Sequence, residues 1–88
     1  MKLILAILHD EDAENVSREL VNASFRVTRI ASTGGFLKHG NTTLVIGLDE
    51  DKVDAAFEII RETCSEPTHP GAKRATLFVL NVANYQQL

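Results

Sequence analysis

The stretch Leu5-Ala-Ile-Leu-His-Asp-Glu-Asp12 is echoed later in the chain by Leu44-Val-Ile-Gly-Leu-Asp-Glu-Asp51. In both stretches, a continuous apolar run of strand length leads directly into a cluster of acidic residues. A continuous apolar run predicts a strand that is buried on both faces, and acidic residues favour the N-terminus of a helix. We therefore predict two strand-to-helix units, one in each half of the chain.

Apolar residues recur at helical spacing after each acidic cluster. The two stripes are Ala13, Val16, Leu20 and Ala23, and Val53, Ala56, Phe57, Ile60 and Cys64. Segments 25–32, 42–48 and 75–82 are rich in β-branched and apolar residues. The middle one is the strand of the second unit, so two further strands are predicted, and the total is four. The order βαββαβ predicts one α+β domain over residues 1–88. We expect a ferredoxin-like sandwich, in which two helices cover one face of a four-stranded antiparallel sheet.

The predicted sheet has one face that the helices cannot cover. Segments 3–8 and 75–82 nevertheless carry apolar residues on both sides. A chain of 88 residues has little material left to cover a second face. Another copy of the chain is the simplest cover, so we predict a homo-oligomer. The polar tail at 83–88 offers Tyr85 and Leu88 as anchors.

The charge of the chain is unevenly distributed. The net charge of −3 argues against a nucleic-acid polymer as the partner. No Asp or Glu occurs between Leu20 and Leu48, where Arg26, Arg29 and Lys38 lie, whereas the other segments hold all twelve acidic residues. This pattern favours a small anionic ligand. One cysteine and no segment long enough to cross a membrane predict a cytoplasmic protein without a membrane partner.

The segment between the second and third predicted strands is rich in glycine. It contains Gly34, Gly35 and Gly40, with Phe36 and Leu37 among them. Glycine lets a ligand approach the main chain closely, and an aromatic ring can stack on a base. Phe36 and Leu37 could equally fold back onto the core or pack in an oligomer contact. The residues alone leave these alternatives open.

Other chemistries are less well supported by the sequence. The acidic clusters are expected to cap helices, because no calcium-loop pattern accompanies them. The histidines and the cysteine lack the spacing of a zinc site. The segment from Gly35 to Thr42 nearly matches a phosphate-binding loop, but Asn41 replaces the required lysine and a strand follows instead of a helix. We expect neither a metal site nor catalytic residues.

Several motifs resemble the PII-like cyclic di-AMP receptor family. Two of them are Ala31-Ser-Thr-Gly-Gly-Phe-Leu-Lys38 and Gly40-Asn-Thr-Thr43, and the specific part is the block from Thr33 to Thr43. Met1-Lys-Leu-Ile-Leu-Ala-Ile, Phe25-Arg-Val-Thr28 and Ala75-Thr-Leu-Phe-Val-Leu80 extend the resemblance over most of the chain.

The resemblance implies a homotrimeric signal receptor without enzymatic activity and without a cofactor. One cyclic di-AMP would lie in each cleft between neighbouring subunits, and an unknown protein partner would act downstream. Arg26 and Thr28 would meet an adenine and a phosphate. Further ligand-binding residues implied by the family are Gly35, Phe36 and Leu37 around a base, Asn41 as a hydrogen-bonding group, Gly47 at a close backbone approach, and Phe78 and Gln87.

The chain departs from the family pattern in some places. Members usually have a long loop before the last strand, where this chain has only residues 65–74, and they usually carry Asn at the position of Ser24. Two alternatives therefore stay open. One is a PII-like sensor of another adenine nucleotide, ATP or ADP. The other is a metal-binding trimer that resembles CutA.

Overall fold

The computed structural model of the chain describes residues 1–33, 40–65 and 73–88. The elements follow the predicted βαββαβ order, with a short 3-10 turn before the second helix. They are β1 (Lys2–His9), α1 (Asp10–Asn22), β2 (Arg26–Thr33), β3 (Asn41–Leu48), η1 (Glu50–Lys52), α2 (Val53–Thr63) and β4 (Ala75–Asn81). No helix in this described part of the chain is both long and apolar enough to span a membrane.

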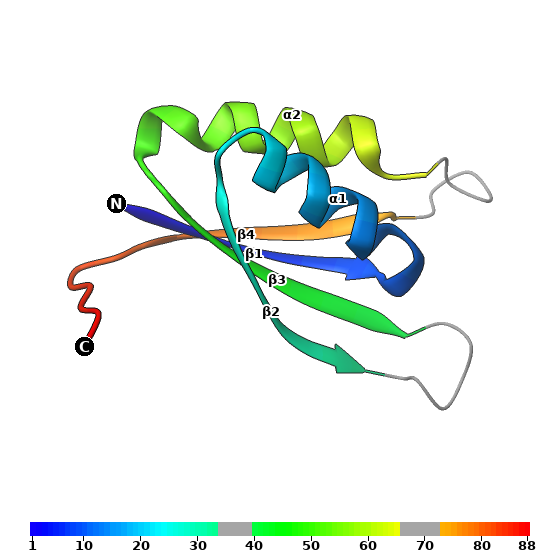
Figure 1. The fold of residues 1–88 in the computed structure, drawn as a ribbon, viewed down its shortest axis with the longest axis horizontal. Coiled ribbons are helices and arrows are strands. Elements are labelled where there is room, and N and C mark those ends of the chain that lie inside the picture. Colours follow the sequence, from blue (N-terminus) through cyan, green and yellow to red (C-terminus); the bar gives the residue numbers. More distant parts are fainter. Residues whose placement is uncertain (34–39, 66–72) are drawn as a thin grey trace.

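The four strands form one antiparallel sheet in the order β2-β3-β1-β4. The two echoing segments pair with each other at its centre, with Ile4 opposite Ile46 and Leu5 opposite Val45. Figure 1 shows α1 and α2 side by side on one face of the sheet. This arrangement is the ferredoxin-like α+β fold that the sequence predicts.

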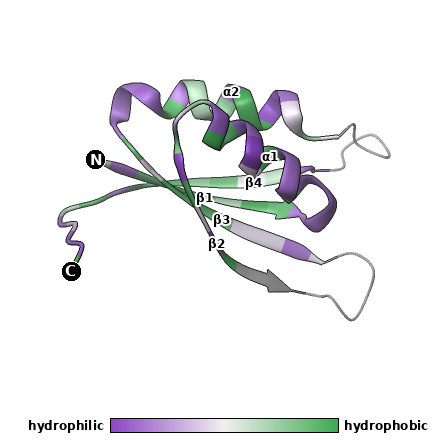
Figure 2. Ribbon diagram, in the orientation of Figure 1, coloured by the Kyte–Doolittle hydropathy of each residue, from purple (hydrophilic) through white to green (hydrophobic). Residues whose placement is uncertain are grey.

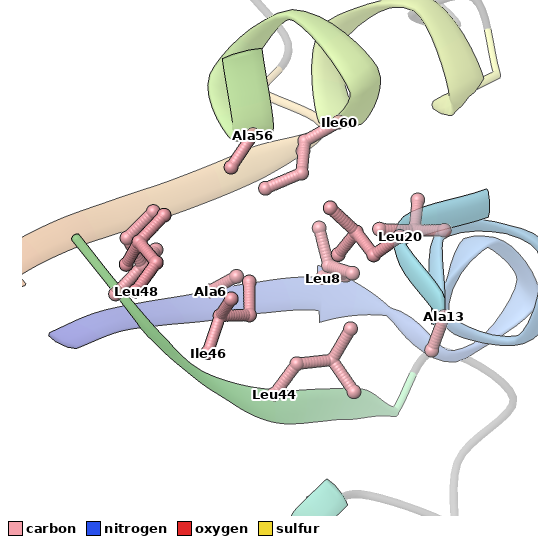
Figure 3. Packing of buried hydrophobic residues seen from close by; sticks show 11 residues of the cluster. Ala6, Leu8, Ala13, Leu20, Leu44, Ile46, Leu48, Ala56 and Ile60 are labelled. Atoms are coloured by element: carbon pink, nitrogen blue, oxygen red, sulfur yellow. The ribbon is translucent and has the colours of Figure 1, made fainter. Parts of the chain in front are cut away.

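The core lies between the helices and the two central strands (Figure 3). Alternate residues of β1 and β3 point into it, because side chains in a strand alternate between faces. The fully buried larger side chains are Ile4, Leu8, Leu44 and Ile46 from the sheet and Val16, Leu20 and Ile60 from the helices. Each such burial contributes about 1.5–3 kcal/mol. Figure 2 shows the same division, with apolar residues on the strands and polar residues on the outer sides of the helices.

The other face of the sheet is apolar and lacks a cover in the described part of the chain. Leu3, Leu5 and Ile7 of β1 are half-buried on this face. On β4, the exposed fractions of Phe78 and Leu80 are 50% and 45%. We call this surface the bare face. The structure confirms that β1 and β4 carry apolar residues on both sides of the sheet; the oligomer that would cover them remains a prediction.

Helix α1 ends in a Schellman motif, which moves the start of β2 by one residue from the expected 25–32. The N–H of Phe25 donates to the carbonyl of Leu20 at 3.0 Å, and the N–H of Ser24 donates to that of Val21 at 2.9 Å. Phe25 thus completes the helix end, and the strand begins at Arg26. Ser24 has a φ of 73°. Only glycine adopts this left-handed conformation without strain, and Asn tolerates it better than most residues.

The acidic cluster at the start of α1 does not supply the helix cap that we expected. The N-cap residue is His9, which makes no side-chain cap hydrogen bond. Asp12 instead lies buried, 4% exposed, and accepts hydrogen bonds from the N–H of Ser65 (3.2 Å) and its hydroxyl (3.3 Å). Arg74 Nη2 lies 3.4 Å from the same carboxylate. Asp12 therefore ties the end of α2 to the start of β4. Asp49 likewise makes no side-chain cap bond, because the chain turns there through η1.

Candidate ligand-binding site

The bare face brings several predicted site residues together through the pairing of β2 with β3. Arg26 lies opposite Gly47, and Thr28 lies opposite Val45. Gly47 in turn lies opposite Leu3 of β1. All five positions belong to one face, because they alternate with the core-facing residues of their strands. Arg26 and Thr28 are both exposed.

A hollow of about 560 Å³ opens over these residues at one end of the sheet. Four predicted site residues line it: Arg26, Thr28, Gly47 and Gln87. The tail after β4 bends toward the side of the sheet that the helices leave bare, which brings Gln87 to the hollow (Figure 1). Residues that are far apart in sequence thus converge on one cavity, within the size range of small-molecule sites.

Gly47 leaves the floor of the hollow without a side chain. A Cβ at this position would lie 3.1 Å from Met1 Cε, which is closer than an ordinary van der Waals contact. The end of the flexible Met1 side chain therefore lies over the main chain of Gly47, and it would have to move for a ligand to reach that main chain. A second hollow of about 440 Å³ shares Met1, Arg26 and Gly47 with the first and extends toward Ser24 and Lys52. Arg26 thus borders both hollows.

The electrostatics of the first hollow favour an anion. Arg26 has the only charged side chain among the described residues that line it, and none of these residues has a side-chain carboxylate. Arg29, from the same acid-free window of sequence, lies on the opposite face of β2. Its guanidinium is 3.4 Å from Glu14 of α1. Of the two arginines in this window, Arg26 therefore lines the hollow and Arg29 does not, while Lys38 lies outside the described residues.

Two other predicted site residues lie on the bare face but away from the hollow. Asn41 begins β3, six residues from Gly47. At about 3.4 Å per residue, this places the two residues roughly 20 Å apart. Phe78 lies on β4 and pairs with Leu5 of β1, on the side of β1 that is away from β3. It does not line the hollow. The remaining predictions, Gly35, Phe36 and Leu37, lie outside the described residues.

Sequence reasoning did not predict the other residues that line the hollow, which are Met1, Leu3, Val45, Val82 and Tyr85. Tyr85 was expected to anchor the tail, together with Leu88. Both side chains are exposed instead: Tyr85 is 57% exposed and Leu88 is fully exposed. The only signal that could have found Tyr85 is an aromatic residue in an otherwise polar tail.

A separate cavity of about 350 Å³ lies between α2 and β4 and includes Cys64 and Arg74 in its lining. Burial, reinforced by the nearby carboxylate of Asp12, raises the pKa of the Cys64 thiol, and Arg74 partly offsets this rise. The thiol is therefore protonated at neutral pH and is a poor nucleophile. Within residues 1–33, 40–65 and 73–88, no three His, Cys, Asp or Glu side chains gather where they could hold a metal ion.

The fold and the hollow define a class of small ferredoxin-like α+β domains with a ligand-sized cavity on the uncovered face of the sheet. Within this class, the chain belongs to the cyclic-di-AMP receptor family, whose model matches residues 1–72. Among solved structures, it is similar to a functionally unknown protein from Pediococcus pentosaceus. The two chains are 35% identical, the match covers 99% of this chain and 96% of that chain, and the TM-score is 0.77.

Proposed function

We propose that this protein is a non-enzymatic receptor that binds cyclic di-AMP in clefts between the subunits of a cytoplasmic homotrimer. Membership of the cyclic-di-AMP receptor family supports the ligand and a binding role. The sequence supplies no arrangement of nucleophile and base that would indicate catalysis. A receptor that catalyses no reaction must pass its signal to another molecule, so a downstream protein partner is part of the proposal.

One observation carries the proposal: Arg26, Thr28, Gly47 and Gln87 line the same hollow, and none of its described lining residues is acidic. A guanidinium forms strong charge-assisted hydrogen bonds with a phosphate. The hydroxyl of Thr28 and the amide of Gln87 can bond to polar edges of a base or sugar. The unsubstituted main chain at Gly47 would allow a flat base to approach once the flexible Met1 side chain moves aside. This set of groups suits a phosphate-containing nucleotide better than a metal ion or an acidic peptide.

The position of Asn41 supports a cleft that two copies share. Asn41 and Gly47 lie on the same face of β3 at opposite ends of the strand. A ligand held beside Arg26 is therefore out of reach of Asn41 in the same subunit. If both residues contact one ligand, Asn41 must come from a neighbouring copy. The apolar bare face provides the surface on which that neighbour would pack.

Calorimetric titration with cyclic di-AMP tests the proposal directly. Arg26→Ala should weaken binding roughly ten- to hundred-fold, because a hydrogen bond to a charged group contributes about 1.5–3 kcal/mol. Arg18→Ala is the matched control, since Arg18 is exposed on α1 and its guanidinium contacts Asn15 at 2.6 Å. Equal affinity of the wild type and Arg26→Ala would contradict the role given to the hollow.

Two further measurements distinguish the proposal from its alternatives. The same titrations with ATP and ADP should show weaker binding than cyclic di-AMP; tighter binding would identify a sensor of another adenine nucleotide. The mass of the purified protein in solution, measured by analytical ultracentrifugation, should be that of three subunits. A monomer that binds cyclic di-AMP with full affinity would refute the shared cleft while leaving the ligand intact.

A further inference from the structure

We infer that Tyr85 provides the aromatic platform on which a purine of the bound nucleotide stacks. This inference rests on the proposed function and adds a binding residue to it. Tyr85 is the only aromatic residue among the described residues that line the hollow. A purine held near Arg26 needs a flat apolar surface as well as polar partners, and base–aromatic stacking is the usual source of that surface.

The other aromatic side chains of the described chain cannot take this role. Phe25 and Phe57 pack against the core between the helices and the sheet. Phe78 lies on the bare face, but Val45 and Leu5 separate it from Thr28 in the same cross-strand row. With about 4.8 Å between neighbouring strands, Phe78 is roughly 14 Å from Thr28.

The environment of Tyr85 leaves its ring available. The side chain is 57% exposed and does not belong to the hydrophobic core. Covering a large aromatic surface that is exposed to water with a ligand or a partner contributes favourable free energy to binding. Its place beside Arg26 and Gln87, in a hollow without carboxylates, favours a ligand that carries both a phosphate and a base. Tyr85 and Gln87 then act together, the ring stacking on the base while the amide meets a polar edge.

The composition of the chain makes this inference simple to test. Tyr85 is the only tyrosine, and there is no tryptophan. Intrinsic fluorescence therefore reports on this one ring. Titration of the wild type with cyclic di-AMP should change the tyrosine emission with the same dissociation constant that calorimetry gives. Binding with unchanged emission would overturn the inference.

Three variants separate stacking from the other roles of the tail. Tyr85→Ala should weaken cyclic di-AMP binding roughly five- to hundred-fold, the range expected for one stacked base. Tyr85→Phe keeps the ring and should bind within about threefold of the wild type. Gln86→Ala is the matched control, because Gln86 is an exposed neighbour that does not line the hollow. The oligomer mass of each variant is also measured by analytical ultracentrifugation.

The outcomes are distinct. A loss of affinity in Tyr85→Ala alone, at unchanged oligomer mass, supports the inference. Wild-type affinity in Tyr85→Ala overturns it, while the proposed function stands if Arg26→Ala still weakens binding. A change of oligomer mass in Tyr85→Ala also overturns it, because the ring is then an anchor between subunits. A wild-type protein that does not bind cyclic di-AMP overturns both proposals.

Discussion

Replacing Arg74 by methionine should show how much one buried ion pair contributes to the stability of the folded chain. The side chains of Asp12 and Arg74 are only 5% and 12% exposed, and the guanidinium is 3.4 Å from the carboxylate. Methionine fills much of the volume of arginine but leaves the carboxylate of Asp12 without a cation. Breaking a buried pair in this way typically costs 3–5 kcal/mol.

The expected loss lies somewhat below that range. Ser65 still donates two hydrogen bonds to Asp12 in the variant, and the ion pair itself is long at 3.4 Å. We therefore expect Arg74→Met to lower the free energy of unfolding by about 2–3 kcal/mol. For a domain of this size, that loss lowers the melting temperature by roughly 10–20 °C. Urea unfolding followed by circular dichroism measures it.

A matched pair on the surface provides the control. Arg61 and Glu58 lie 3.3 Å apart, and their side chains are 72% and 55% exposed. Arg61→Met should change the stability by less than about 0.5 kcal/mol, because water screens exposed pairs. Adding Asp12→Asn to Arg74→Met should recover at least about 1 kcal/mol, since the amide oxygen can still accept from Ser65 but carries no charge.

Cys64 offers a second readout of the same cluster. Burial raises the pKa of its thiol most, Asp12 raises it further, and Arg74 lowers it. Alkylation at fixed pH should therefore be faster in Asp12→Asn and slower in Arg74→Met, because the thiolate is the reactive form.

The role given to the buried ion pair is refuted if Arg74→Met unfolds at the same urea concentration as Arg61→Met. It is also refuted if adding Asp12→Asn to Arg74→Met lowers the free energy of unfolding further.

Two further predictions concern the end of α1 and the bare face. Ser24→Gly should raise the free energy of unfolding by about 0.5–1 kcal/mol, because relief of the left-handed strain at this residue exceeds the added freedom of the unfolded chain. Ser24→Ala should give no such gain in the same urea experiment. If Ser24→Ala stabilises the protein as much as Ser24→Gly, the backbone at Ser24 is not strained. Phe78→Glu should reduce the mass measured by analytical ultracentrifugation to that of a monomer, because it buries a charge in the proposed interface. Val21→Glu, on an exposed apolar residue of α1, should not change the mass; an unchanged mass in Phe78→Glu would exclude this part of the bare face from any interface.

Local patterns were sufficient to predict the fold. The continuous apolar runs around Leu5 and Val45 predicted two strands, and these strands pair at the centre of the sheet. The boundaries of β2, β3 and β4 differ from the predicted ones by at most one residue, and a hydrogen bond explains the shift at the start of β2. Phe25 is the example, since its apolar side chain suits a strand but its N–H completes the cap of α1.

Long-range contacts could not be predicted in the same way. The acids after β1 have the composition of a helix start, and they do occupy the first turn of α1. The role of Asp12 depends on Ser65 and Arg74, which are 53 and 62 residues away in the sequence. No local pattern encodes that approach. The sequence therefore indicated where the acids lie along the helix but not which partners they bind.

The candidate site shows the same limit. Alternation along β2 places Arg26 and Thr28 on one face and Arg29 on the other, so that part could be predicted from the sequence. The arrival of the tail, and of Tyr85 in particular, depends on how the chain leaves β4. A polar tail without periodicity contains no information about that direction.

The geometry of β3 also bears on the symmetry of the proposed assembly. Each subunit presents two unlike part-sites on one face, with Arg26 and Gly47 at one end of the strand and Asn41 at the other. A two-fold dimer can meet this requirement, because residue i of one subunit contacts residue j of its copy and residue j contacts residue i. A cyclic ring can meet it as well, with the Arg26 end of one subunit against the Asn41 end of the next. The geometry of β3 therefore supports a cleft that two copies share, whereas the number of three subunits in the proposal rests on the family resemblance.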